Sequence, residues 1–126
     1  MRVLFSVLAL IFLVLTIAAA QDIAVVDAEH TKVVFENDEV RVLRFSFPPG
    51  TKQVMHDHPD HVIVILTDQQ GRSTTPDGQV KDVSAKAGYA GFRSAYKHTF
   101  ENTGTTQAEG LIVELKCKPE AKATAK

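Results

Sequence analysis

The amino-acid sequence predicts an all-β domain, a sandwich or barrel built from short strands. Three observations lead to this fold class. Apolar residues recur mainly in short alternating runs, turn residues separate the runs at nearly regular spacing, and no long helical period appears. About nine such runs in one chain are typical of β-sandwiches and barrels.

The strands are predicted from the alternation and from the turns that end it. Asn37-Asp38 forms a turn between the first two strands, and Pro48-Pro49-Gly50 ends the second one. Further turn residues lie at 67–71, 76–78 and 102–105. The predicted strands are residues 33–36, 40–47, 53–58, 61–66, 72–75, 80–85, 90–93, 98–101 and 108–116.

The N-terminus has the plan of a secretory signal peptide. Arg2 precedes an apolar run over 3–17, and the small residues Ala18 to Ala20 place the cleavage site before Gln21. The alternative is an uncleaved membrane anchor, because the run is near the shortest length that spans a bilayer. Either way the sequence predicts export, to the periplasm or the medium, and after cleavage no contact with the membrane.

Cleavage of 20 residues from the 126 leaves 106, enough for one hydrophobic core. We expect a signal peptide at 1–20, an N-terminal arm at 21–32, a barrel at 33–117 and a disordered tail at 118–126. Without Arg2 the chain has 13 basic residues against 15 acidic ones, a charge of −2, which predicts no nucleic-acid partner. Cys117 is the single cysteine and cannot form an internal disulfide, although it could cross-link two copies.

Three of the five histidines lie close together in the chain. His56, His58 and His61 follow Gly50 within a few residues. On a strand, residues two apart point to the same face, so His56 and His58 can converge on one metal ion. Imidazole nitrogens bind such an ion at about 2.0 to 2.1 Å. The spacing therefore predicts a metal site on this strand.

Here the sequence resembles the cupin superfamily, in particular small bacterial cupins labelled β-alanine degradation proteins. The first cupin motif places a Gly, five residues, His-x-His and then a Glu, and Gly50, His56 and His58 match its first half. The Glu is missing. Aligning the hydrophobic end of the motif with residues 63–66 puts His61 at the Glu position.

The second cupin motif is represented by Gly88, His98 and Asn102 at the expected spacing. Ser94 replaces its Pro, and Tyr96 replaces its second Gly, which puts a phenol near the mouth of the barrel. The resemblance covers about residues 33–116. It implies a double-stranded β-helix, or jelly-roll barrel, in which His56, His58, His61 and His98 hold one divalent transition metal ion.

Several points stay open at this stage. His61 is a metal ligand, a donor that orients His58, or a loop residue facing solvent. The sequence does not choose among Fe, Mn, Ni, Cu and Zn, all of which suit imidazole ligands. The resemblance implies a metal-dependent oxygenase, isomerase or lyase acting on a small oxygen-rich molecule; the alternatives are a ligand-binding protein without catalysis and a structural metal site. It also implies a homodimer.

Other side chains have plainer expected roles. Phe45, Phe47, Phe92 and Phe100 are expected to line or cap the barrel. Asp57 alternates with the two histidines beside it and is expected to face outward.

Overall fold

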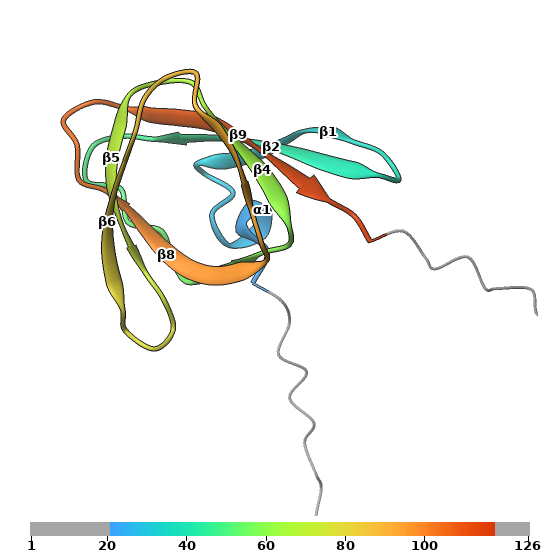
Figure 1. Cartoon of the computed structure of the whole chain (residues 1–126), viewed down its shortest axis with the longest axis horizontal. Helices are drawn as coiled ribbons and strands as arrows, with labels where there is room; N and C mark the ends of the chain where they lie inside the picture. Colours follow the sequence, from blue (N-terminus) through green and yellow to red (C-terminus); the bar gives the residue numbers. More distant parts are fainter. Residues whose placement is uncertain (1–20, 118–126) are drawn as a thin grey trace, which may run out of the picture.

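The computed structural model describes residues 21–117 and shows a barrel of antiparallel strands (Figure 1). The predicted signal peptide at 1–20 and the predicted tail at 118–126 lie outside the described residues. No helix within the described part is long and apolar enough to cross a membrane. The elements are α1 (Ile23–Val26), β1 (Thr31–Glu36), β2 (Val40–Phe47), β3 (His56–His58), β4 (His61–Ile65), β5 (Gln69–Thr74), β6 (Val80–Ala85), β7 (Ala90–Arg93), β8 (Tyr96–Asn102) and β9 (Ala108–Leu115).

The strands form two sheets. The larger sheet has the order β1-β2-β9-β4-β7 and the smaller one the order β3-β8-β5-β6. Strands that neighbour one another in a sheet are often distant in the chain, as β2 and β9 are. This arrangement is the jelly-roll barrel that the sequence predicts, and the fold class is confirmed.

Alternation along the strands builds the core between the sheets. On β2 the buried side chains Leu43, Phe45 and Phe47 point inward, and the rings of Phe45 and Phe47 stack at 4.9 Å. The buried hydrophobic residues are Ile23, Leu43, Phe45, Phe47, Ile65, Ala108 and Ile112. Phe100 packs against this cluster. Phe92 does not, since its side chain is 58% exposed on the outer face of β7, so its predicted packing role is wrong.

The short helix α1 packs against the barrel. Asp22 caps it by accepting a hydrogen bond from the backbone N–H of Ala24, and Ile23 is buried in the core. Just before the helix, Gln21 and Asp57 exchange two hydrogen bonds, from the Asp57 N–H to the Gln21 carbonyl and from the Gln21 N–H to the Asp57 carboxylate. The N-terminal arm thus lies directly beside the strand that carries His56 and His58.

The two motif glycines have backbone conformations that favour glycine. Gly50 has φ of 79° and Gly88 has φ of 88°, both in the left-handed region. Gly50 lies in the turn before β3, which carries His56 and His58, and Gly88 lies in the turn before β7. The buried Asn102 shapes a further turn, because its side-chain amide donates to the carbonyls of Phe47 and Thr106. The motif residues therefore shape the turns around the site.

Candidate metal centre

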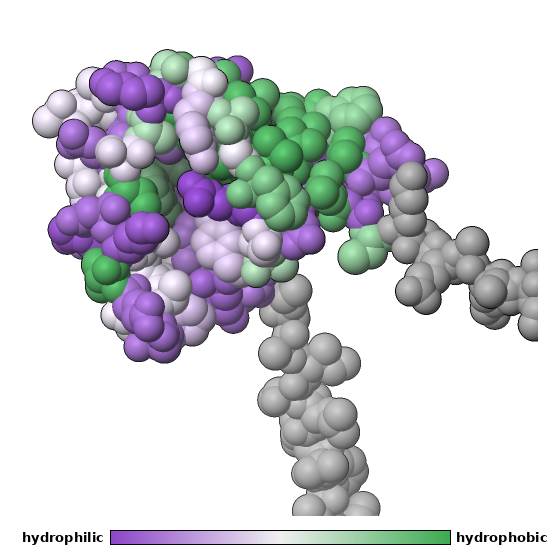
Figure 2. All heavy atoms as spheres, in the orientation of Figure 1, coloured by the Kyte–Doolittle hydropathy of each residue, from purple (hydrophilic) through white to green (hydrophobic). Residues whose placement is uncertain are grey.

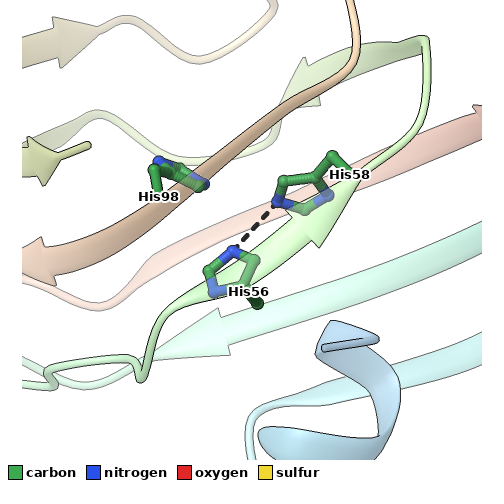
Figure 3. A group of neighbouring side chains, drawn as sticks. All are labelled: His56, His58 and His98. Atoms are coloured by element: carbon green, nitrogen blue, oxygen red, sulfur yellow. Dashed lines mark hydrogen bonds between the residues drawn. The ribbon is translucent and has the colours of Figure 1, made fainter. Parts of the chain in front are cut away.

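His56, His58 and His98 converge between the sheets (Figure 3). His56 and His58 lie on β3, and His98 is the partner of His56 on the neighbouring strand β8. Residues that are direct partners in an antiparallel pair point to the same face, so all three side chains point inward. One nitrogen from each ring lies within 4.8 Å of the others, and all three residues are buried. These nitrogens could hold one metal ion.

The ring nitrogens of His56 and His98 that point away from this centre have fixed partners. The Nδ1 atom of His56 lies 2.8 Å from the carbonyl oxygen of Val54, and Nδ1 of His98 lies 2.8 Å from the hydroxyl of Ser73. A carbonyl only accepts hydrogen bonds, so the proton of neutral His56 is on Nδ1. Its Nε2 atom then carries a lone pair directed at the centre. Such outer partners are the usual way in which proteins orient metal-binding imidazoles.

For His58 the outer partner is the carboxylate of Glu114. The Nδ1 atom of His58 and the Oε1 atom of Glu114 are 3.8 Å apart, and both residues are almost fully buried. Neither atom has a hydrogen-bond partner. A separation of 3.8 Å is too long for a hydrogen bond. A small approach would satisfy both atoms, because a protonated Nδ1 can donate only to an acceptor, and the carboxylate is one.

The inner nitrogens of His56 and His58 lie close enough to share a proton or a cation. Their Nε2 atoms are 3.0 Å apart. With both Nδ1 atoms protonated, two lone pairs face each other. Moving the proton of His58 to Nε2 relieves this contact but turns the lone pair of Nδ1 toward the Glu114 carboxylate. A metal ion or an extra proton between the two Nε2 atoms would let His58 keep a proton on Nδ1, facing the carboxylate.

The same distance fits two bonds to one ion. Two nitrogens that each bind one metal ion at about 2.1 Å can be 3.0 Å apart. His56 and His58 could therefore both bind the same ion.

His61 lies beside this group but is not one of the three. It begins β4, its side chain is buried, and its ring centre is 4.9 Å from that of His58. Its Nδ1 atom lies 2.7 Å from the carbonyl oxygen of Pro59, which leaves Nε2 free. The interpretation of His61 as a solvent-facing loop residue is therefore wrong. That it binds the metal stays a prediction.

Sequence reasoning did not find Glu114. On β9 the buried residues alternate as Ala108, Gly110, Ile112 and Glu114, and a carboxylate on an otherwise apolar face is a signal that could have found it. Direct pairing of β2, β9, β4 and β7 aligns four inner residues in one row, Arg41, Glu114, His61 and Arg93. Arg41 donates to Glu114 at 2.7 Å and to Asp22 at 2.6 Å. A buried carboxylate thus stands beside the histidines, although the motif lacks its Glu.

Burial favours the neutral form of His56, His61 and His98. It lowers the pKa of His56 to about 4 and that of His98 to about 3, and it also lowers the pKa of His61. Burial alone would raise the pKa of Glu114, but the neighbouring His58 and Arg41 lower it overall. Neutral imidazoles and one ionised carboxylate are the states in which these groups bind or support a metal.

Tyr96 covers the centre. It is the strand partner of His58, and its ring is 5.5 Å from that of His58, 5.7 Å from His61 and 4.4 Å from His98. Burial raises its pKa, so the hydroxyl stays protonated. Tyr96 and His98 also line a cavity of about 470 Å³, which adjoins the histidine group. A larger hollow of about 700 Å³ contains none of the histidines.

The remaining residues noted in the sequence lie outside the centre. His30 is half-buried and its Nδ1 atom lies 2.7 Å from the carboxylate of Asp27. Asp57 lies between His56 and His58 and, as expected, does not join them, since its carboxylate bonds with Gln21. Cys117 is exposed and free.

The sequence matches no protein-family model and no curated protein. The structure does resemble solved structures. A cupin domain from Bordetella pertussis Tohama I is 27% identical with a TM-score of 0.64, over 69% of this chain and 92% of that one. A predicted oxalate decarboxylase from Thermotoga maritima is 27% identical with a TM-score of 0.50, over 68% of this chain and 79% of that one. A cupin superfamily protein from Desulfitobacterium hafniense DCB-2 is 20% identical with a TM-score of 0.52, over 69% and 76%, which shows the fold alone. The fold of this chain is thus the cupin double-stranded β-helix, and its structural neighbours support the cupin superfamily.

Proposed function

We propose that this protein is a metal-dependent small cupin in which His56, His58 and His98 hold one divalent transition metal ion, with His61 as a fourth ligand. The observation that carries the proposal is the group of three buried histidines, each of which offers one ring nitrogen within 4.8 Å of the others. The buried carboxylate of Glu114, directed at the outer nitrogen of His58, supports the same arrangement. Fe, Mn, Ni, Cu and Zn all suit these ligands.

We further propose that the centre binds and transforms a small oxygen-containing molecule in the adjoining cavity. The bound ion would polarise an oxygen of that molecule. Tyr96 supports this proposal, because its protonated phenol lies against the histidines and lines the cavity, where it can donate a hydrogen bond to a ligand. An oxygenase, isomerase or lyase reaction would fit such a site.

Elemental analysis of the purified protein tests the metal. We expect about one equivalent of transition metal per chain and loss of that metal when His56 and His58 are both replaced by alanine. His30→Ala is the matched control, because His30 is half-buried, lies outside the centre and bonds with Asp27. A metal content that stays the same in the double variant, or that is negligible after reconstitution, contradicts the proposal.

We also propose that two copies form a homodimer through the outer face of the larger sheet. Direct strand partners align five apolar residues across all five strands: Phe35, Val42, Val113, Val62 and Phe92. Phe35 is 53% exposed and Phe92 is 58% exposed. Figure 2 shows hydrophobic residues gathered over the region of β1, β2, β4 and β9. A second copy presenting the same row would cover this surface.

Light scattering with reductant present tests the dimer without any contribution from Cys117. We expect the mass of two chains for the wild type and of one chain for Phe92→Ser. A wild type that is monomeric at micromolar concentration contradicts the proposal.

We propose that the protein is exported and that the mature chain begins at Gln21. The basic, apolar and small-residue order of residues 1–20 supports this. A chain cut there would keep the bonds between Gln21 and Asp57 and the helix that follows. Intact-mass measurement on exported material would show the mass of 21–126, whereas a mass that includes residues 1–20 favours the membrane anchor.

A further inference from the structure

The cavity beside His98 has an apolar wall. Its volume of about 470 Å³ is in the range of sites that enclose a small organic molecule. Its apolar lining comes from three strands, β4, β6 and β8, and these residues are Ile63, Ile65, Val80, Val83, Ala85 and Phe100. In Figure 2 the molecule is hollowed inside the ring of strands that Figure 1 shows. A ligand that fills this space needs an apolar body, because an inorganic ion would leave the wall in contact with water alone.

The charged side chains that line the cavity are all positive. They are Lys81 and Arg93, and no aspartate or glutamate lines it. Within residues 21–117, neither side chain forms an ion pair with a carboxylate or a hydrogen bond with a protein group. The other arginines of this part of the chain are all paired: Arg41 with Asp22 and Glu114, Arg44 with Glu109, and Arg72 with Asp82.

Arg93 stands next to the metal centre. It is the direct partner of His61 on β4, at the end of the inner row that also contains Glu114 and Arg41. Arg41 donates to the carboxylate of Glu114, whereas Arg93 forms no ion pair with it. Because guanidinium groups form paired hydrogen bonds with carboxylates, an unpaired one at this position is suited to a carboxylate on a ligand.

The proposed metal adds to the positive charge. Neutral imidazoles leave the two charges of a divalent ion uncompensated, and the carboxylates of Asp22 and Glu114 share a single Arg41. The group as a whole, with Arg93 and Lys81, therefore has a positive net charge. A negatively charged ligand is the complement of such a site.

We propose that the cavity binds an organic carboxylate with an apolar body, and that Arg93 is the residue that recognises the carboxylate. The proposal rests on the metal-dependent function above for part of the charge, whereas Arg93 and the apolar wall belong to the chain itself. The expected ligand is therefore a small organic monoanion. A neutral molecule would lack the charge, and a bare inorganic anion would lack the apolar body.

Three probes separate the contributions of charge and apolar body. Phenylacetate has both, phenylacetamide has nearly the same shape without the charge, and acetate has the charge without the ring. Calorimetric titration is carried out on Zn(II)-loaded and on metal-free protein, for the wild type and for Arg93→Gln. Arg44→Gln is the matched control, because Arg44 is an exposed arginine that pairs with Glu109 and does not line the cavity. Zinc affinity is measured separately for each variant.

We expect wild-type protein to bind phenylacetate at least tenfold more tightly than either other probe, which corresponds to about 1.4 kcal/mol. Arg93→Gln should abolish the preference for phenylacetate over phenylacetamide, whereas Arg44→Gln should keep it, and both variants should keep wild-type zinc affinity. Equal affinity for acid and amide, no binding of any probe, or an unchanged preference in Arg93→Gln would overturn the inference. If neither zinc nor any other of the proposed ions binds, the metal proposal fails, and a preference for phenylacetate in metal-free protein that Arg93→Gln removes still supports the carboxylate site.

Discussion

Replacing Glu114 with glutamine changes the group that faces Nδ1 of His58 and little else. The amide is nearly isosteric with the carboxylate, and Arg41 keeps its second partner, Asp22. An amide offers one acceptor and one donor, however, and both neighbours of Glu114 are donors. If its oxygen faces Arg41, its NH2 group faces Nδ1 of His58. The proton of His58 then moves to Nε2, which is the nitrogen that the metal needs.

The expected magnitude follows from this geometry. His58 and Glu114 have side chains only 3% and 4% exposed, so solvent does not screen the contact, and an approach of less than about 1 Å from 3.8 Å makes a charge-assisted hydrogen bond. Loss of such an outer partner lowers metal affinity about 10 to 100-fold, or about 1.4 to 2.7 kcal/mol. We expect Glu114→Gln to fall in this range.

Competition titration with a chromophoric chelator measures the metal affinity, and nitrogen NMR of the imidazoles reports which nitrogen of His58 carries the proton. Glu109→Gln is the matched control, because Glu109 lies on the same strand and also pairs with an arginine, Arg44, away from the histidines. The reasoning would be refuted if Glu114→Gln bound metal as tightly as Glu109→Gln while His58 remained protonated on Nδ1.

Three further predictions follow. The pKa values of His56 and His98, about 4 and about 3, lie below the unfolded value of 6.5, so the unfolded chain takes up more protons as pH falls. Metal-free protein should therefore lose stability below about pH 6.5, by up to ~1.4 kcal/mol per pH unit for each histidine, and urea titrations at pH 7 and 5 with equal midpoints would contradict this. His61→Ala should weaken metal binding, and His61→Glu should restore it with a shift toward Mn(II); equal affinities for the three proteins remove His61 from the site. Gly88→Ala should cost about 1 to 2 kcal/mol in thermal unfolding, because φ is 88° and no atom lies near the added methyl, so an unchanged melting temperature would refute a cost from backbone conformation.

Local patterns in the sequence were enough to predict most strands and the convergence of His56 and His58. The segments 40–47, 80–85 and 90–93 were predicted with the bounds that the structure has, because alternation and turn residues act within a few positions. The spacing of His56 and His58 was sufficient to place both on one face of a strand. The predicted strand at 53–58 was too long, since β3 comprises only His56–His58.

Only the tertiary structure decided which faces and which distant residues meet. Alternation divides a strand into two faces but does not say which one is inside, and for this reason Phe92 was assigned to the interior although it is exposed. Glu114 reaches His58 because β9 pairs with β4, and Arg93 joins the same inner row because β7 does. Pairing between strands far apart in the chain depends on the packing of the whole barrel. No local pattern records that packing. The sequence indicates Arg93 as a residue that could meet a ligand, but its place beside His61, and the carboxylate of Glu114 beside the histidines, became visible only in the fold.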